Sequence, residues 1–295
     1  MDIRQTPLWE NYLIKLGWQV AKLSGKHSAF LRKIPLLGTV IKIPRISAPI
    51  PFEEIDKLAT DNKSLFVKLE PNIEVGAKNS DFILQELISH GFALDSWALS
   101  HTATLQIDLT GSEEELLKSL EKDTRYNIRL AQRSKVVVKQ TDNLDEFKEL
   151  YYQTAKRNRF WVASKELETL WETFYRQGCS VILSAYREEE LLASVLLIWF
   201  GKIGCYQHAA SGNQYRKLMA PYLLLWESLR FLKKKGCSVF DLEGVYDARI
   251  KSTRRWQGFT LFKRGFGGRE VKYLGSFVKY YNPLAKIIFS LTRWF

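Results

Sequence analysis

Apolar residues recur in the first third of the chain with two spacings, and each spacing predicts one type of element. Apolar positions three and four residues apart follow Thr6 and Pro7, which predicts a capped helix that ends at Gly17. The same spacing predicts further helices over residues 52–60 and 81–89. Short apolar runs between Gly, Lys and Pro turns predict strands over residues 18–23, 29–34, 38–43, 64–69 and 102–109. This combination of hairpins and crossovers predicts a mixed α/β unit.

The rest of the chain follows a similar plan, which predicts a second unit. It opens on Ser112, and three glutamates follow in the first turn, as is typical of a capped helix. Helical spacing covers residues 112–133, 144–158, 165–177 and 218–235. Strand patterns cover residues 180–186, 191–200, 203–209 and 238–242. We therefore predict two domains, over residues 1–110 and 111–271.

The composition of the 295 residues, with 46% hydrophobic and 26% charged residues, is typical of a soluble globular protein. Four His and three separated Cys have no metal-ligand spacing, and an odd number of thiols argues against a disulfide framework. We expect no metal site and a reduced, cytoplasmic environment. The first residues lack the order of a signal peptide. The longest apolar run, residues 191–200, is about half of the ~20 residues that a spanning helix needs. We expect no membrane-spanning segment.

The net charge of +12 is concentrated in one part of the chain. Residues 211–295 hold 17 Lys and Arg against 5 Asp and Glu, while basic and acidic groups balance in the remaining residues. A concentrated positive charge attracts polyanions, which makes nucleic acid, a nucleotide-linked sugar or an anionic lipid a candidate partner. A solvated basic face that aids solubility is the alternative.

Two segments of the last third carry the most specific signal. Residues 240–244 read Phe-Asp-Leu-Glu-Gly, and residues 262–268 read Phe-Lys-Arg-Gly-Phe-Gly-Gly. A buried strand that ends in carboxylates, followed by a basic, glycine-rich turn, is the layout of a site for an anionic ligand. The pair resembles the patterns "yDlxGi" and "FKxxFGG" of the Fem family of aminoacyl-tRNA-dependent transferases, which add amino acids to the peptidoglycan stem peptide.

The resemblance implies a fold and covers essentially the whole chain. It implies an α/β (α+β) protein of two GNAT-like acyltransferase domains with mixed, mostly antiparallel sheets. It also implies that the last segment, residues 272–295, packs back on the first domain. The larger members of the family carry a long helical arm, whereas residues 144–177 leave room only for an ordinary helical pair. We therefore expect the compact, FemX-like form.

The resemblance also implies a reaction, in which an amino acid passes from aminoacyl-tRNA to a side-chain amine of a peptidoglycan precursor. Such a transfer needs no metal, cofactor or protein nucleophile, because the ester is already activated; it needs alignment, proton removal and oxyanion stabilisation. The candidate catalytic residues are Lys263, Asp108 and Asp241. Asp241 and Glu243 point to the same face of a strand and either handle a proton or form ion pairs with arginines. Asp108 either acts as a base or caps the next helix.

The candidate tRNA-binding residues follow from the same resemblance. They are Phe262, Lys263, Arg264, Arg254 and Arg255. In the family the Phe stacks on the terminal base of the tRNA and the Lys lies near the ester, a combination that is usual for holding single-stranded RNA. The alternative is a helix end in which Phe262 and Phe266 lie in the core.

A further set of residues is expected to bind the cell-wall precursor, whether lipid-linked or nucleotide-linked. These candidates are Lys42, Arg45, Lys68, Tyr206, Tyr215, Arg216, Arg125 and Arg129. Arg125 and Arg129 lie four residues apart on one predicted helix face, a fork suited to phosphate, although Glu121 could instead pair with Arg125.

Two alternative functions remain open. A GNAT enzyme that transfers an acyl group from acyl-CoA to a polysaccharide or small amine would need a glycine-containing pyrophosphate loop, and residues 215–221 lack its two glycines. A non-enzymatic RNA- or membrane-binding protein on the same scaffold is the third possibility. The C-terminal segment, residues 283–295, either lies in a membrane interface at the inner face of the membrane or packs on its own domain.

Overall fold

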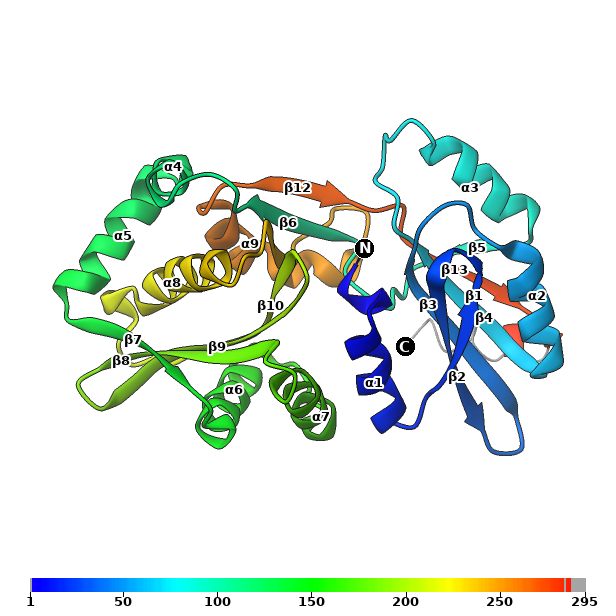
Figure 1. Cartoon of the computed structure of the whole chain (residues 1–295), viewed down its shortest axis with the longest axis horizontal. Helices are drawn as coiled ribbons and strands as arrows, with labels where there is room; N and C mark the ends of the chain where they lie inside the picture. The colour runs from blue at the N-terminus through cyan, green and yellow to red at the C-terminus, as the bar shows by residue number, and fades with distance from the viewer. Residues whose placement is uncertain (1, 284, 288–295) are drawn as a thin grey trace. The chain divides into compact units, whose positions relative to one another are not determined.

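The computed structural model describes residues 2–283 and 285–287, and the chain forms two compact units (Figure 1). The first unit comprises Met1–Ala103, Asp247–Lys251 and Val271–Phe295, and the second comprises Thr104–Tyr246 and Ser252–Glu270. Among the described residues, no helix is long and apolar enough to cross a membrane. The C-terminal segment, residues 283–295, for which membrane contact and packing on its own domain were the alternatives, falls largely outside the described residues.

The first unit is built on a six-stranded sheet with the order β1-β2-β3-β4-β13-β5, in which only β3 and β4 run parallel. Its strands are β1 (Gln19–Leu23), β2 (His27–Ile34), β3 (Gly38–Ile46), β4 (Ser64–Pro71), β5 (Ala93–Asp95) and β13 (Ser276–Tyr280). Its helices are η1 (Ile3–Gln5), α1 (Pro7–Lys15), η2 (Ser24–Lys26), α2 (Phe52–Asp61) and α3 (Ser80–Ser89). As predicted, Thr6 caps α1 and Pro7 is its first residue.

The core of the first unit lies between its sheet and the helices α2 and α3. Both helices bury an apolar stripe, which includes Ile55 of α2 and Leu87 of α3. The sheet contributes buried residues from its central strands, including Val67 of β4 and Phe277 of β13. Residues 200 positions apart in the chain therefore share one core, so β13 is an integral part of the first unit.

The second unit is built on a seven-stranded sheet with the order β12-β6-β11-β10-β9-β8-β7. Its strands are β6 (Ala103–Asp108), β7 (Val136–Thr141), β8 (Ser180–Arg187), β9 (Glu190–Phe200), β10 (Ile203–Ser211), β11 (Val239–Gly244) and β12 (Arg269–Lys272). The β10–β11 pair is parallel, and the pairs β6–β11, β9–β10, β8–β9 and β7–β8 are antiparallel. The sheets of both units are thus mixed and mostly antiparallel, as predicted.

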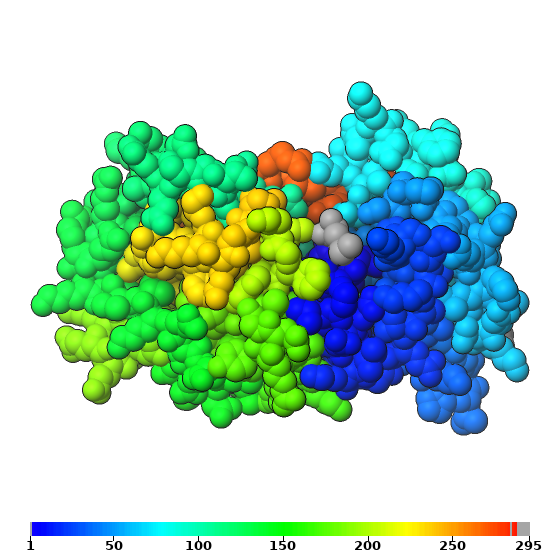
Figure 2. Space-filling model, viewed as in Figure 1, coloured from blue at the N-terminus to red at the C-terminus, as the bar shows by residue number. Residues whose placement is uncertain are grey.

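Helices cover both faces of the second sheet (Figure 1). They are α4 (Glu113–Ser119), α5 (Lys122–Arg133), α6 (Leu144–Asn158), α7 (Ser164–Tyr175), η3 (Arg216–Leu218), α8 (Ala220–Lys234), η4 (Lys251–Trp256) and α9 (Gln257–Arg264). Helix α8 lies on one face, and α6 and α7 lie on the other. Eight consecutive residues of β9 are buried, as expected for a strand covered on both faces. In Figure 2 the side chains of α8, in yellow, form part of the visible surface of the second unit.

Two predictions about the elements are wrong. The strand at residues 102–109 was assigned to the first domain, but β6 pairs with β11 in the second sheet. The sequence could not reveal this pairing, because the partner strand lies more than 130 residues further along the chain. The single helix predicted over residues 112–133 is two helices, broken at Leu120 and Glu121, which are both extended. The break is held because Glu121 donates its amide hydrogen to the carbonyl of Gly265 at 2.9 Å and Leu120 is buried.

Candidate active site

The candidate active site lies in the second unit, where the end of β11 departs from regular strand geometry. The pairing of β11 with β6 is interrupted between Asp241 and Gly244. Glu243, in this interval, has a φ of 60°, which is uncommon for a residue with a side chain. Such irregularities re-aim side chains at the edge of a functional site. The side chains of Asp241 and Glu243 therefore do not follow the regular alternation of a strand, on which the prediction that they share one face was based.

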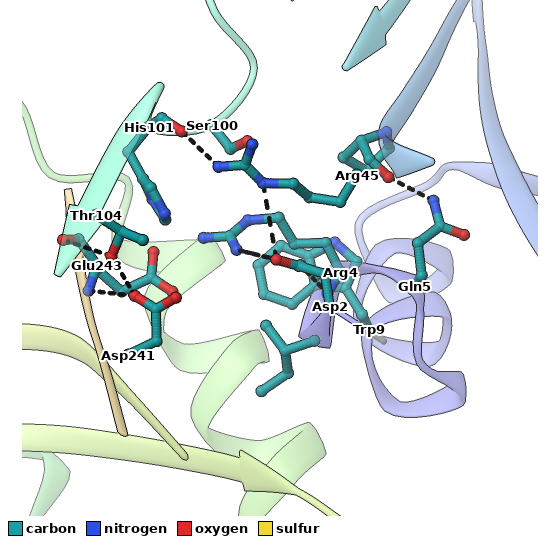
Figure 3. A network of polar contacts seen from close by, with 12 residues as sticks. Asp2, Arg4, Gln5, Trp9, Arg45, Ser100, His101, Thr104, Asp241 and Glu243 are labelled. Carbon is teal, nitrogen blue, oxygen red and sulfur yellow. Dashed lines mark hydrogen bonds and ion pairs between the residues drawn. The ribbon is translucent and has the colours of Figure 1, made fainter. Parts of the chain in front are cut away.

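The carboxylate of Asp241 is buried and is held by three donors. It accepts hydrogen bonds from Thr104 Oγ1 and from the amide of Glu243 at 2.7 Å (Figure 3). It also accepts one from Gln106 Nε2 at 3.0 Å. Two of these donors come from β6, the neighbouring strand. Because both of its oxygens are already engaged, Asp241 is suited to fixing the local backbone and the charge around it rather than to exchanging a proton with a substrate.

Lys263 reaches the same strand end from α9. Its side chain is only 8% exposed, and its Nζ donates to the carbonyl oxygen of Gly244 at 2.8 Å. Burial lowers the pKa of Lys263 to about 8, although the charges of Glu243 and Asp241 act in the opposite direction. A lysine with this pKa exists in both protonation states near neutral pH, which is unusual for a structural lysine and typical of a functional one.

A neutral histidine lies on the next strand. His208 follows an irregularity in β10, and its Nδ1 is 3.1 Å from the hydroxyl of Tyr151 on α6. Burial lowers the pKa of His208 to about 4, and the charge of Glu243 opposes this shift. The imidazole is therefore uncharged at pH 7. His208 lies two residues after the predicted candidate Tyr206, but Tyr151 carries no signal in the sequence, because it lies on an ordinary amphipathic helix.

The glycines after α9 allow the chain to approach its neighbours closely. A Cβ atom on Gly265 would lie 2.3 Å from Thr124 Oγ1, and one on Gly268 would lie 2.6 Å from the carbonyl oxygen of Gln106. Gly267 and Gly268 both have positive φ, at 72° and 89°. The turn therefore packs against α5 and β6 with no room for a side chain. This packing explains the glycines of the motif.

The aromatic residues of the motif have different environments. Phe266 is fully buried, which matches the core alternative for this residue. Phe262 is half-buried and meets Tyr222 and Phe266 edge to face, with ring centroids 4.9 and 5.5 Å away. Only Phe262 thus keeps an accessible edge for a ligand.

Three predicted tRNA-binding arginines lie near α9 but differ in their availability. Arg254 and Arg255 are exposed in η4. Arg264 is exposed as well, but its guanidinium binds Glu270 Oε1 at 2.6 and 2.9 Å. A ligand phosphate would have to compete with this ion pair at Arg264, so Arg254 and Arg255 are the more available cations.

Two predictions for the second unit need correction. Asp108 is exposed and accepts hydrogen bonds from the amide and hydroxyl of Thr110 at 2.8 and 2.7 Å. These bonds lower the pKa of Asp108, which disfavours the role of a base. Asp108 does not cap the next helix either, because Ser112 is the N-cap of α4 and Asp108 only stabilises the turn at Thr110. Tyr206 was expected to bind the precursor, but it is buried against Phe240, and burial raises its pKa.

The remaining precursor-binding candidates of the second unit lie on its surface. Arg125 donates to the backbone carbonyls of Lys118 and Leu120 and thereby supports the break between α4 and α5. Arg129, Tyr215 and Arg216 are exposed. They stay predictions, whereas Arg125 has a structural role.

The candidates of the first unit have partners within that unit. Arg45 is 2% exposed, stacks on Tyr273 at 3.5 Å from the ring centroid, and lies 3.7 Å from the carboxylate of Asp2 (Figure 3). Lys68 is also buried and pairs with Asp95 at 3.0 Å. The anchoring of a precursor by Arg45 and Lys68 stays a prediction, although both cations are buried and have carboxylate partners within the first unit. Asp2 also pairs with Arg4, and Arg45 Nε has no hydrogen-bond partner among the described residues. Lys42 is half-buried, with its Nζ 3.9 Å from the centre of the Trp18 ring.

The basic excess of the last third is not confined to one unit. It is divided between the two units, and several of its cations are paired internally. Arg230 binds Glu113 and Glu227, Arg249 binds Asp247, and Lys279 binds Asp56. The charge run in the sequence therefore overestimates the positive field that is available to a polyanion.

The two mixed sheets with helices on their faces form a GNAT-like fold. The chain is similar to the crystal structure of FemX, with a TM-score of 0.81 at 18% identity over 97% of this chain and 94% of that chain. It is also similar to a tandem GNAT protein from the clavulanic acid biosynthesis pathway, with a TM-score of 0.54 at 10% identity over 88% and 82% of the two chains. These similarities confirm the predicted fold class.

The sequence identifies the family within this class. The model of the FemAB family matches residues 3–185 and 173–292, so the chain belongs to the FemAB family. The chain is 21% identical over 311 residues to the Lipid II:glycine glycyltransferase of Staphylococcus haemolyticus (strain JCSC1435), a match that covers 80% of this chain and 74% of that protein. The resemblance carried by residues 240–268 is thus confirmed.

Proposed function

We propose that this chain is an aminoacyltransferase that moves an amino acid from aminoacyl-tRNA to the side-chain amine of a peptidoglycan precursor. Its place in the FemAB family supports a transferase, and the glycyltransferase relative is named for lipid II, a lipid-linked acceptor. The observation that carries the proposal is the buried ammonium of Lys263 at the end of β11, together with the charges of Asp241 and Glu243.

The reaction is the aminolysis of an ester. The acceptor amine attacks the ester carbonyl carbon, an oxyanion forms, and the bond to the ribose oxygen of the tRNA breaks. The amine loses one proton and the ribose oxygen gains one, so the balance requires no oxidant, metal or cofactor. Because the ester is already activated, the protein has to supply alignment, proton transfer and oxyanion stabilisation.

The site residues divide these tasks. Lys263 in its charged form stabilises the oxyanion, since a buried ammonium acts strongly where water is excluded. Glu243, which is half-buried beside it, accepts the proton of the amine, and the neutral His208 lies close enough to respond to its charge. Asp241 is a positioning residue, because its hydrogen bonds to β6 and to the amide of Glu243 fix the strand end.

The donor is held beside this strand end. Phe262 offers a half-buried aromatic edge on which the terminal base of the tRNA stacks, and Arg254 and Arg255 offer exposed charges for its phosphates. Charged tRNA is a cytoplasmic substrate, so we place the reaction at the cytoplasmic side of the membrane.

The start of α8 argues against acyl-CoA as the donor. In GNAT enzymes free backbone amides at this position bind the pyrophosphate. Here the amides of Leu218, Met219 and Tyr222 donate to backbone carbonyls, and Pro221 has no amide hydrogen. Met219, the residue before α8, also has a left-handed backbone conformation, with a φ of 54°.

A transfer assay tests the proposal. The protein is incubated with a mixed pool of charged tRNA and with lipid-linked and nucleotide-linked precursors, and the products are weighed by mass spectrometry. We expect the mass of one amino acid residue to be added to one precursor, and ribonuclease treatment of the pool to abolish it. A product formed from acyl-CoA but not from charged tRNA would establish the GNAT alternative instead.

A further inference from the structure

The turn between β2 and β3 in the first unit has an unusual sequence for its shape. Leu37 donates its amide hydrogen to the carbonyl of Ile34 at 3.1 Å, which closes a four-residue turn. Pro35 and Leu36 occupy the two central positions, and Leu36 has a φ of 64°. This combination is typical of a type II turn, in which the third position favours Gly or Asn. A leucine there is conformationally unfavourable.

None of the described residues of the first unit covers the side chain of this leucine. Leu36 is fully exposed and Leu37 is 62% exposed, while Pro35 beside them is exposed as well. The turn projects from the lower edge of the first unit (Figures 1 and 2). Single exposed leucines are common on protein surfaces, but adjacent leucines at the tip of a protruding turn form a local apolar patch. The fold therefore offers no reason for these two side chains.

Basic residues surround the base of this hairpin tip, which we define as residues 34–37. Arg32 and Lys33 precede it on β2 and are exposed. Lys63 lies next to the start of β3, on the other side of the tip, and is exposed. Its carbonyl oxygen accepts the amide hydrogen of Thr39 at 3.3 Å. The carboxylate of Asp61 is already paired with Lys57 at 2.7 Å. The tip thus combines an apolar end with a positive base.

We infer that the hairpin tip inserts into the surface of an anionic lipid bilayer, with Leu36 and Leu37 in the interface and the basic residues at the phosphate level. Exposed apolar side chains with adjacent Lys and Arg are the chemistry that binds such surfaces. A second copy of the chain fits less well. Two identical basic tips repel each other, and two leucines bury far less area than the roughly 1,600 Å² of a stable interface.

Vesicle sedimentation tests this inference without any substrate, so its outcome is separate from that of the proposed function. The full chain is mixed with phosphatidylcholine vesicles that contain or lack phosphatidylglycerol. We expect binding that requires phosphatidylglycerol and weakens as salt is added. Leu36→Asn with Leu37→Asn should lower the binding constant at least tenfold, and Asn suits the turn, so the melting temperature should not fall.

Charge variants and matched controls complete the test. Lys33→Gln and Lys63→Gln should each lower binding to anionic vesicles about fivefold. The controls are Leu94→Asn, at an exposed leucine of β5, and Lys165→Gln, at an exposed lysine of α7; both should bind as the native chain does. Native-like binding by the double leucine variant would overturn the inference. A second result would also overturn it: the native chain does not bind vesicles, and light scattering shows that it is a dimer and the double leucine variant a monomer. This result would assign the tip to contact with a second copy.

Discussion

Lys263 is the residue at which burial and charge act most directly against each other. Its desolvation favours the neutral amine, while Asp241 and Glu243 favour the ammonium, and the balance gives a pKa of about 8. The ammonium is therefore present at neutral pH but is lost within the range in which the enzyme can still be assayed. The role of the Lys263 ammonium can therefore be tested by measuring the transfer rate as a function of pH.

The first prediction concerns the charge of Lys263. If the ammonium stabilises the oxyanion, Lys263→Ala should slow single-turnover transfer by about 10²–10³-fold. In the native enzyme the rate should fall as pH rises through about 8, because Lys263 loses its proton there. Lys263→Arg keeps a charge that does not titrate in this range, so this alkaline decrease should disappear from whatever activity remains.

The control is Lys165→Ala, which removes an exposed lysine of the same unit and should leave the rate and its pH dependence unchanged. Rates have to be corrected for spontaneous hydrolysis of the ester at high pH. Native-like transfer by Lys263→Ala, or an unchanged alkaline decrease in Lys263→Arg, would show that another group carries this role.

At the scale of elements, the turn that follows α9 joins three parts of the second unit. Its glycines lie against Thr124 of α5 and Gln106 of β6, and Gly265 accepts the hydrogen bond that holds the break before α5. The end of α9, from which Lys263 projects, is therefore positioned by close backbone contacts. A side chain at these positions would have to displace neighbouring backbone or side-chain atoms.

A pair of glycine variants tests this packing. Gly268→Ala introduces a Cβ atom 2.6 Å from a carbonyl oxygen at a φ of 89°, so it should lower the free energy of unfolding by about 2–4 kcal/mol. Gly258→Ala is the matched control, since Gly258 lies in α9 with nothing within 4 Å of the added atom. It should raise the free energy of unfolding by up to about 1 kcal/mol. Denaturant unfolding measures both, and equal effects of the two variants would refute the close approach.

The glycine turn also shows what sequence could predict about the site. The spacing of residues 240–268 identified the family, the strand end that carries Asp241 and Glu243, and the helix that carries Lys263. It could not reveal that the glycines are required by Thr124 and Gln106, because those contacts join segments more than 100 residues apart. Tyr151 was missed as the partner of His208 because that contact, too, is made in the folded chain, across 57 residues.

The differences between sequence and structure at this scale have related causes. Arg45 and Lys68 were predicted as precursor anchors, and no local sequence pattern indicates that they are buried and pair with Asp2 and Asp95. The helix over residues 112–133 was predicted as continuous because its amphipathic pattern is nearly unbroken. Tertiary contacts at Leu120 and Glu121 then override the local preference.

For the molecule as a whole, the order of the chain differs from the order of the folded parts. The first unit combines residues from both ends of the chain with the short segment Asp247–Lys251. Strand β13, near residue 280, lies between β4 and β5 and joins them into one sheet. Contacts of such large sequence separation form late and at a high entropic cost in folding. The first unit therefore depends on a strand that is synthesised after the entire second unit.

The last prediction tests this dependence at Phe277, which is 1% exposed in β13 and belongs to the core of the first unit. Phe277→Ala should lower the free energy of unfolding of the first unit by about 3–5 kcal/mol, because it leaves a cavity under the sheet. Amide hydrogen exchange should show this loss of protection in β4 and β5, the two strands that β13 joins. Phe82→Ala, at an exposed phenylalanine of α3, is the control and should change stability by less than about 0.5 kcal/mol. Full protection of β4 and β5 in Phe277→Ala would mean that the first unit holds its sheet without this strand, and that the C-terminal segment only covers a core formed by the first hundred residues.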